Sequence, residues 1–198
     1  MPSPFGHALG GVAAAWLVDL IPGDRRGRSA PEAASWFDQA GDGLTAICAA
    51  LAISPDLDLA FRTHRTVTHS VGAALVVGLI AAAIASRKGR PVLRVAFMCA
   101  GAYGSHVLFD WLAADRYLPY GLQALWPFSG QWFISGWDIF AQTERRNLLT
   151  LPSMTQNARA IGRELVLLGP IVALLWLVRV KALARLAAQM SGRHHSAQ

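Results

Sequence analysis

Residues 66–86 read TVTHSVGAALVVGLIAAAIAS, and this stretch decides the fold class. From Val71 onward it is apolar on every side, with no polar stripe that would let one helix face meet water. Its length is close to the ~20 residues that span the hydrocarbon core of a bilayer. We therefore predict a membrane-spanning helix here.

Four further apolar segments flank this stretch when charged residues are taken as their limits. They are residues 5–18, 43–55, 95–109 and 165–178. Gly and Ala are abundant in these segments, and small residues let helices approach closely in lipid. We predict an all-α fold, an integral membrane bundle of about five helices that forms a single domain over residues 1–198.

Three local features refine this prediction. The first segment lacks the positive start of a signal peptide and carries His7 where its apolar run begins, so we expect a retained helix. Gly169 and Pro170 lie inside the last segment and predict a kink. Residues 115–160 are rich in Trp, Gly and Pro, which suits an aromatic segment at the membrane interface.

Composition supports a membrane protein. Of the 198 residues, 54% are hydrophobic and 15% are charged, whereas soluble domains average roughly 25% charged residues. Disorder is excluded, and an ordinary soluble enzyme is disfavoured. Cys48 and Cys99 lie in separate apolar runs, so neither a disulfide framework nor a zinc ribbon is expected.

Basic residues occur in short clusters between the apolar segments. The clusters are Arg25, Arg26 and Arg28; Arg87, Lys88, Arg90 and Arg94; and Arg179, Lys181, Arg185 and Arg193. In a five-helix topology all three fall on one side, which the positive-inside rule assigns to the cytoplasm. Residues 180–198 then form a polar basic cytoplasmic tail. This distribution indicates the lipid bilayer as a partner and no nucleic acid.

Seven ionisable residues at helix ends share the opposite, non-cytoplasmic side. They are His7, Asp56, Asp58, His64, His69, His106 and Asp110. Four of the six histidines and three of the nine aspartates thus gather in one region, where burying an unpaired ionisable group costs several kcal/mol. His106 and Asp110 are spaced i, i+4 on one helix face. We predict a shared metal centre, and imidazole with carboxylate suits zinc, manganese or iron.

Structural roles remain open for each residue taken alone. HxxxD pairs are more often hydrogen-bonded pairs than metal ligands. Asp56 and Asp58 also suit interfacial solvation or a cap for the helix at 66–86. The two histidines of residues 64–70 suit a solvated loop in which Thr66 or Thr68 caps that helix. Asp19 is expected to be a solvated helix end, and Glu164 to form an ion pair or to support the metal ligands indirectly.

Five short motifs resemble those of a known family. They are GH at 6–7, PDLD at 55–58, HRTVTHS at 64–70, SHVLFDWL at 105–112 and LWPFS at 125–129. Over about residues 5–130 the chain resembles the YdjM-like family of inner-membrane metal-dependent hydrolases. The resemblance implies a multi-pass protein of the bacterial inner membrane whose His and Asp residues bind a divalent metal. Thr66 stands where the family often has a small residue.

The order of the motifs is also distantly similar to that of zinc-dependent phospholipase C and the single-strand nucleases, which implies phosphoester cleavage. Our hypothesis is metal-assisted hydrolysis of a lipid or lipid-linked substrate, in which the metal lowers the pKa of water from 15.7 to roughly 7. Asp56, Asp58 or Asp110 would bridge metals or act as general base, and Arg65 would hold an anionic group. The alternatives are a non-enzymatic protein that binds or transports a metal, and a soluble Ala-rich helical domain.

Overall fold

The chain folds into helices joined by irregular segments. The computed structural model describes residues 1–21, 43–61, 64–145 and 147–195, leaving aside the side chains of Phe61 and of residues 182–195. The helices are α1 (Pro4–Leu20), α3 (Leu44–Ile53), η1 (Ser54–Phe61), η2 (Val67–His69), α4 (Val71–Arg87), α5 (Val92–Leu112) and α6 (Leu151–His195), where η denotes 3₁₀ helices. Over the described residues there are only two isolated β-bridges and no strand, which confirms the all-α prediction.

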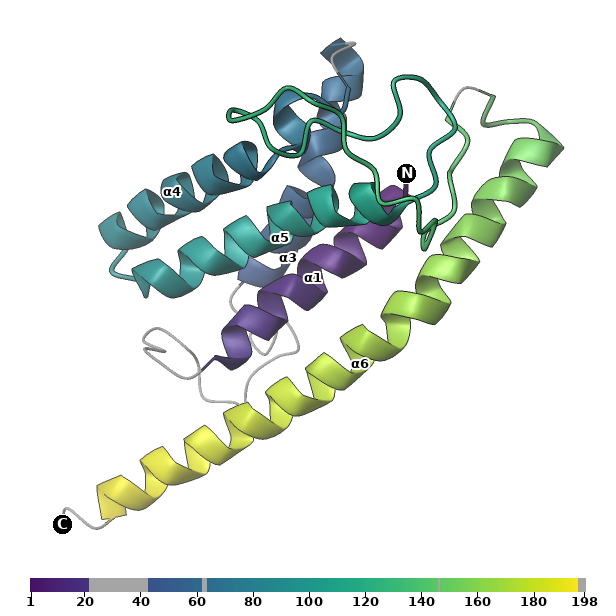
Figure 1. The fold of residues 1–198 in the computed structure, drawn as a ribbon. Helices are drawn as coiled ribbons and strands as arrows, with labels where there is room; N and C mark the ends of the chain where they lie inside the picture. The colour runs from purple at the N-terminus through teal and green to yellow at the C-terminus, as the bar shows by residue number, and fades with distance from the viewer. Residues whose placement is uncertain (22–42, 62–63, 146, 196–198) are drawn as a thin grey trace.

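The α-helices form a bundle around α5, which packs against α1, α3 and α4 (Figure 1). α1 also contacts α3 and α6. The shared core consists of small or flexible side chains, namely Ala15, Cys48, Ala81, Met98, Cys99 and Ala102. A Cβ atom on Gly11 would lie 2.8 Å from the Cys48 carbonyl oxygen, so the backbones of α1 and α3 approach closely at this glycine. This packing agrees with the role expected of the small residues.

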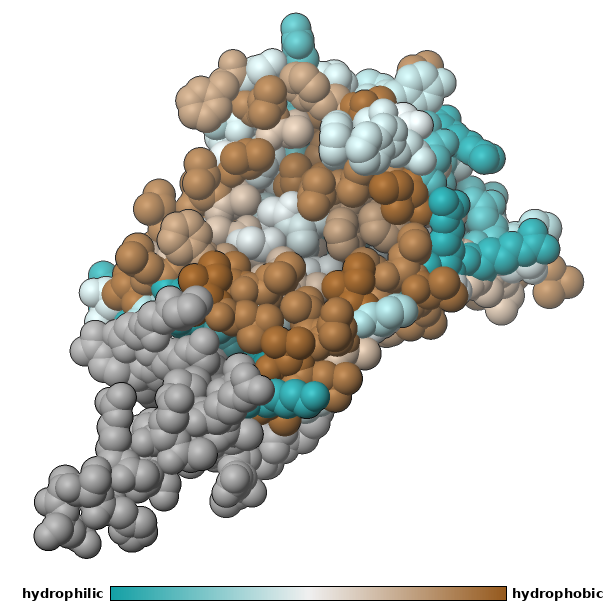
Figure 2. Space-filling model, turned by 60° about the horizontal axis from the view of Figure 1, so that its bottom comes forward, coloured by the Kyte–Doolittle hydropathy of each residue, from teal (hydrophilic) through white to brown (hydrophobic). Residues whose placement is uncertain are grey.

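Two helices are long and apolar enough to cross a membrane, namely α5 and residues 151–181 of α6. The stretch at 66–86 supplies a shorter helix, since the 17 residues of α4 measure about 26 Å against a hydrocarbon core of ~30 Å. Only 17% of the most apolar part of α6 is buried. Apolar side chains cover a broad face of the molecule (Figure 2). A surface of this kind fits contact with lipid.

α4 begins at Val71 rather than at Thr66 because Ser70 caps it. The Ser70 hydroxyl oxygen accepts a hydrogen bond from the Ala73 N–H at 3.1 Å and donates to the Val67 carbonyl at 2.6 Å. The preceding residues form the short helix η2, which ends at His69. Capping by serine is strong enough to set the end of a helix. The histidine-containing segment therefore lies outside α4, at its N-terminal end.

α6 begins at Leu151, well before the expected start at residue 165, and remains helical through Pro170. It extends beyond the apolar segment because a buried stripe continues toward its N-terminus, comprising Ser153, Ala160, Glu164 and Leu168. These positions repeat at helical spacing, so one face of the polar first turns also packs on the bundle. Figure 1 shows α6 as one continuous curved helix along the outside of the bundle.

The aromatic-rich segment between α5 and α6 covers one end of the bundle. The backbone N–H of Gln123 donates to Arg65 O, and the N–H groups of Val71 and Gly72 donate to Ala124 O and Trp126 O. Trp126 O would lie 2.5 Å from a Cβ on Gly72, so this close approach requires glycine. The segment is thus attached directly to the residues around η2.

The other end of the bundle carries basic residues of the two clusters that the structure describes. Asp19, at the end of α1, is 1% exposed and contacts two of them, through Arg94 at 3.3 Å and Arg179 at 2.8 Å. The expectation of a solvated Asp19 is therefore wrong. The cluster formed by Arg25, Arg26 and Arg28 lies outside the described residues.

Candidate metal centre

The seven His and Asp residues singled out in the sequence meet at the end of the bundle opposite Asp19. His7 lies in the first turns of α1, and His106 and Asp110 lie in the last turns of α5. Asp56 and Asp58 belong to η1, His69 ends η2, and His64 precedes it. Close side-chain contacts connect all seven into one cluster, through the pairs His7–Asp110, His69–Asp110, His106–Asp110, His69–Asp56, His69–Asp58 and His64–Asp58.

The carboxylate of Asp110 lies at the centre of this cluster. Its Oδ1 is 3.4 Å from His7 Nε2, and its Oδ2 is 3.4 Å from His69 Nε2 and 3.3 Å from His106 Nε2. All five atoms are buried without a hydrogen-bond partner. Leaving such groups unsatisfied costs about 1–3 kcal/mol each, and more for a charged one. A group bound among these atoms would offset that cost.

A metal ion fits the observed separations. Two ligand atoms about 2.1 Å from one tetrahedral ion lie about 3.4 Å apart, whereas hydrogen-bonded atoms lie about 2.7–3.2 Å apart. Asp56 Oδ1 lies 3.7 Å from His69 Nε2 and 3.8 Å from His106 Nε2, close to the same spacing. The described residues contain two sets of candidate ligands, His7, His106 and Asp110, and Asp56, His64 and His69. These buried His and Asp groups could hold a metal ion.

The hydrogen bonds of His106 and His69 leave their Nε2 atoms available. His106 Nδ1 lies 2.7 Å from the Ala52 carbonyl, which only accepts, so Nδ1 carries the proton and donates it. His69 Nδ1 lies 3.1 Å from Asp58 Oδ2. When these imidazoles are neutral, the Nε2 lone pair of each faces Asp110. Outer partners of this kind orient metal-binding imidazoles.

Asp58 lies behind the imidazoles. Its Oδ1 is 2.7 Å from His64 Nδ1, and its Oδ2 accepts a hydrogen bond from the Thr68 hydroxyl at 2.5 Å. Burial raises the pKa of Asp58, but the hydrogen bonds from His64, His69 and Thr68 outweigh burial and hold that pKa well below its usual range. Asp58 is therefore ionised near neutral pH and faces the outer nitrogens of two histidines.

Asp56 is held by a cation from the loop before α6. Arg145 donates to its carboxylate at 3.2 and 3.4 Å. Burial raises the pKa of Asp56, but His69, His106 and Arg145 outweigh burial and lower it to about 2. For His69, burial lowers the pKa, but the Asp56 and Asp58 carboxylates raise it to about 9. The ionised Asp56 and Asp58 carboxylates thus favour positive charge beside them, as a cation site must.

Glu164 of α6 fixes the start of α1 and hence the position of His7. It accepts hydrogen bonds from the Ser3 backbone N–H at 2.6 Å and from the Ser3 hydroxyl, whose oxygen in turn accepts from the Gly6 N–H at 3.1 Å. A Cβ on Gly6 would lie 2.6 Å from the Glu164 carboxyl carbon. The glycine of the GH motif therefore makes room for this carboxylate.

Arg65 lies beside the cluster in a constrained conformation. Its φ is 67°, in the left-handed region that non-glycine residues rarely occupy. The guanidinium forms an ion pair with Asp115 and donates to the Met1 sulfur at 3.0 Å. It lines a cavity of about 490 Å³ together with Met1, His64, Tyr117, Trp132 and Arg145. A surface with two guanidinium groups thus adjoins the cluster.

The comparison with known families decides what kind of protein carries this cluster. The family model of the YdjM inner membrane protein matches residues 1–186 of the chain. The chain belongs to this family. The resemblance noted from the five motifs is confirmed, and it extends beyond residue 130 to most of α6. No curated protein and no solved structure matches the chain.

Three residues that contact the cluster or its neighbours carried little signal in the sequence. Arg145 and Asp115 lie in the irregular segment, where no helical periodicity predicts which side chain faces inward. The sequence predicts an ion pair or an indirect support of the ligands for Glu164, but its partner is Ser3 rather than a neighbouring arginine. Its position on the buried stripe of α6 is the signal that could have identified it.

Proposed function

We propose that this member of the YdjM family is a metal-dependent hydrolase that cleaves a phosphoester-type bond in a lipid or lipid-linked substrate. The observation that supports it best is the set of unpaired Nε2 atoms of His7, His69 and His106 around the unpaired Asp110 carboxylate. We infer that the helices cross the bacterial inner membrane several times, with the cluster on the non-cytoplasmic side and the basic end in the cytoplasm.

The proposed ligands are the residues whose Nε2 or carboxylate oxygen atoms face one another. His69, His106, Asp56 and Asp110 would hold one ion, and His7 with the second oxygen of Asp110 would hold another or complete the first. Nitrogen and carboxylate ligands at this spacing suit zinc best, with manganese or iron as alternatives. Asp58 acts as a positioning residue, because both its oxygens already contact His64, Thr68 and His69.

The remaining groups supply proton transfer and substrate binding. When bound, a zinc-type ion lowers the pKa of a water molecule from 15.7 to about 7 and polarises the scissile group. Asp58 accepts the Nδ1 proton of His64, so His64 Nε2 is available as a proton acceptor beside the cavity. The Met1 sulfur lies 3.0 Å from this nitrogen and must move aside when substrate enters. Arg65 and Arg145 would bind an anionic group.

The alternative is a protein that binds or transports a metal without catalysis. Among the described residues, the unpaired His and Asp atoms gather at one end of the bundle. At the other end, the buried carboxylate of Asp19 pairs with two arginines. A transport path needs ligands along its length, so this distribution favours hydrolysis. The arginine-lined cavity beside the cluster favours it further.

The test separates ligands from catalytic groups by measuring metal content and turnover on the same samples. Protein purified in detergent and loaded with Zn²⁺ or Mn²⁺ is assayed with bis(4-nitrophenyl) phosphate and with phosphatidylglycerol in mixed micelles. We expect His106→Ala to lose both metal and turnover, and His64→Ala to keep metal and lose turnover. Arg65→Ala should keep metal and weaken turnover.

The matched control is Ser105→Ala, on the same helix as His106. The Ser105 side chain is buried, but its hydroxyl donates only within its own helix, to Ala102 O at 2.7 Å. It should retain both metal and turnover. Metal-loaded protein that cleaves neither substrate would favour the non-enzymatic alternative, and undiminished turnover in His106→Ala would contradict the proposed site.

A further inference from the structure

A second cavity lies at the basic end of the bundle, away from the metal centre. It has a volume of about 480 Å³ and runs between α3, α4 and α5. Its apolar wall is formed by Leu44, Ile47, Leu51, Val77, Ile84 and Val95. Ile47 and Ile84 are 54% and 50% exposed, so the cavity is a groove that opens on the outer surface of the bundle.

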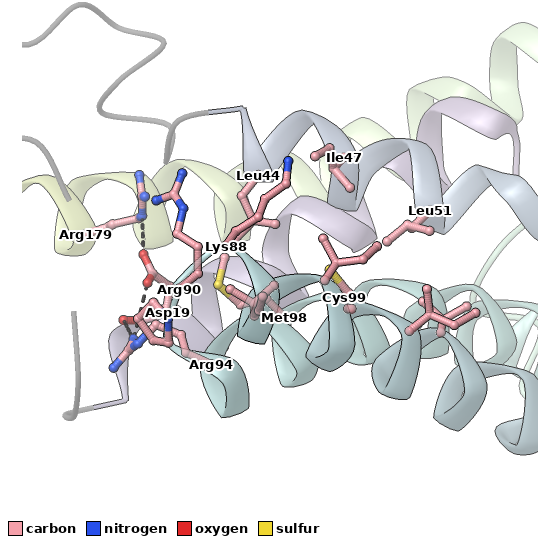
Figure 3. A pocket seen from close by; sticks show the side chains of 17 residues that line it. Asp19, Leu44, Ile47, Leu51, Lys88, Arg90, Arg94, Met98, Cys99 and Arg179 are labelled. Carbon is pink, nitrogen blue, oxygen red and sulfur yellow. Dashed lines mark hydrogen bonds and ion pairs between the residues drawn. The ribbon is translucent and has the colours of Figure 1, made fainter. Parts of the chain in front are cut away.

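Cationic side chains gather at one end of this groove (Figure 3). Lys88 and Arg90, from the turn between α4 and α5, are exposed there, and Arg94 and Arg179 hold the Asp19 carboxylate between them. The described lining residues therefore include four cations and one carboxylate, so this end of the groove is basic. Figure 3 shows Leu51 at the far end, away from these charges.

An apolar groove with a cationic mouth is complementary to one class of molecule. We propose that it binds an anionic phospholipid of the adjacent leaflet, with an acyl chain along α3, α4 and α5 and the phosphate at Lys88 and Arg90. The exposed isoleucines at its edge would let an acyl chain enter from the bilayer. Basic pockets between helices near a membrane surface bind lipid head groups in this way.

This lipid site is separate from the proposed hydrolytic site. Arg94 and His106 are 12 residues apart on α5, which corresponds to about 18 Å along the helix axis. A phosphate held at the basic mouth therefore cannot reach the metal ligands. The bound lipid would hold α3 and the turn between α4 and α5 together, as a structural ligand and not as a substrate.

The test measures lipid binding to the full-length protein by native mass spectrometry in detergent. Phosphatidylglycerol and phosphatidylcholine are titrated separately. We expect phosphatidylglycerol to bind at least about tenfold more tightly. Each basic side chain near a membrane surface contributes about fivefold in affinity, so the double variant Lys88→Gln, Arg90→Gln should lose about 25-fold. Val77→Phe places a larger side chain in the apolar wall and narrows the groove, so it should also weaken phosphatidylglycerol binding.

Arg87→Gln is the matched control, because Arg87 belongs to the same basic cluster but is not among the residues that line the groove. It should bind phosphatidylglycerol like the wild type, and thermal unfolding verifies that every variant is folded. Equal affinity for the two lipids, or unchanged affinity in the double variant, would overturn the proposal. So would full competition by millimolar inorganic phosphate, which would indicate a simple anion site without an acyl-chain groove.

Discussion

Replacing Gly11 by alanine tests how closely α1 and α3 must approach for the metal centre to form. A Cβ at this position would lie 2.8 Å from the Cys48 carbonyl oxygen and would also overlap Ala52 Cβ, whereas ordinary contacts are 3.4–4 Å. The two helices must therefore separate by roughly 1 Å. Overpacking of this kind typically costs about 1–3 kcal/mol. For a chain of this size, we expect Gly11→Ala to lower the Tm by about 3–10 °C.

The same displacement should disturb the metal centre. Ala52, on α3, accepts the hydrogen bond that orients His106, so moving α3 misplaces that imidazole. Unfolding can be followed in detergent with a thiol-reactive fluorophore, because Cys48 and Cys99 are both buried and free. Metal content is measured on the same samples.

Gly101→Ala is the control for this experiment. A Cβ at Gly101 would meet only Val18 Cγ2, at an ordinary contact distance of 3.8 Å. It should leave the Tm and the metal content of the protein unchanged. If Gly11→Ala, like Gly101→Ala, unfolds at the wild-type temperature and retains its metal, α1 and α3 do not pack closely at Gly11.

Three further predictions concern α1, the cluster and the orientation. Glu164→Ala should lower the free energy of unfolding by about 2–3 kcal/mol, because the buried Ser3 N–H and O–H groups lose their acceptor. Leu165→Ala, on the exposed face of α6, should leave thermal unfolding unchanged. Because the pKa of His69 is raised to about 9, metal binding at pH 7 should release a proton. The metal affinity should then rise about tenfold per pH unit up to pH 9 and level off above it. Calorimetry in buffers of different ionisation enthalpy measures this proton release. Metal binding without proton release would show that His69 is already neutral at pH 7. A cysteine at Lys88→Cys should react with an impermeant maleimide in inside-out vesicles only, and labelling from the outside would reverse the orientation.

Much of this architecture follows from local sequence patterns. The apolar segments predicted the helices because the membrane requires the backbone polar groups to be satisfied within each segment. Helix ends were predicted less well. Ser70 begins α4 later than the apolar pattern suggested, and the buried stripe of α6 extends it far toward its N-terminus. Both effects depend on hydrogen bonds or packing that the hydropathy of a segment does not record.

The candidate site was predictable because its ionisable side chains lie at the ends of apolar helices. Burying ionisable side chains among apolar helices costs free energy unless they share partners. This argument selected the residues that meet around Asp110. The sequence could not assign separate roles within the set. Asp58 contacts the outer nitrogens of His64 and His69, an arrangement that depends on the turn geometry of η1 and η2.

The tertiary partners of isolated charges were the least predictable. Asp19 resembled a solvated helix end, and its burial between two arginines depends on α6 passing the end of α1. Arg145 lies in a segment without periodicity, so only the folded chain reveals that it pairs with Asp56. Such contacts join residues far apart in sequence and have no local pattern.

The most direct test of the metal centre is elemental analysis of protein purified in detergent without chelators. We expect about one or two zinc, manganese or iron ions per chain in the wild type and in Ser105→Ala. We expect almost none in His106→Ala and Asp110→Asn, because the two replaced side chains lie at the centre of the cluster. A wild-type protein with almost no metal after incubation with Zn²⁺, or an Asp110→Asn variant with the wild-type content, would contradict the proposed metal centre.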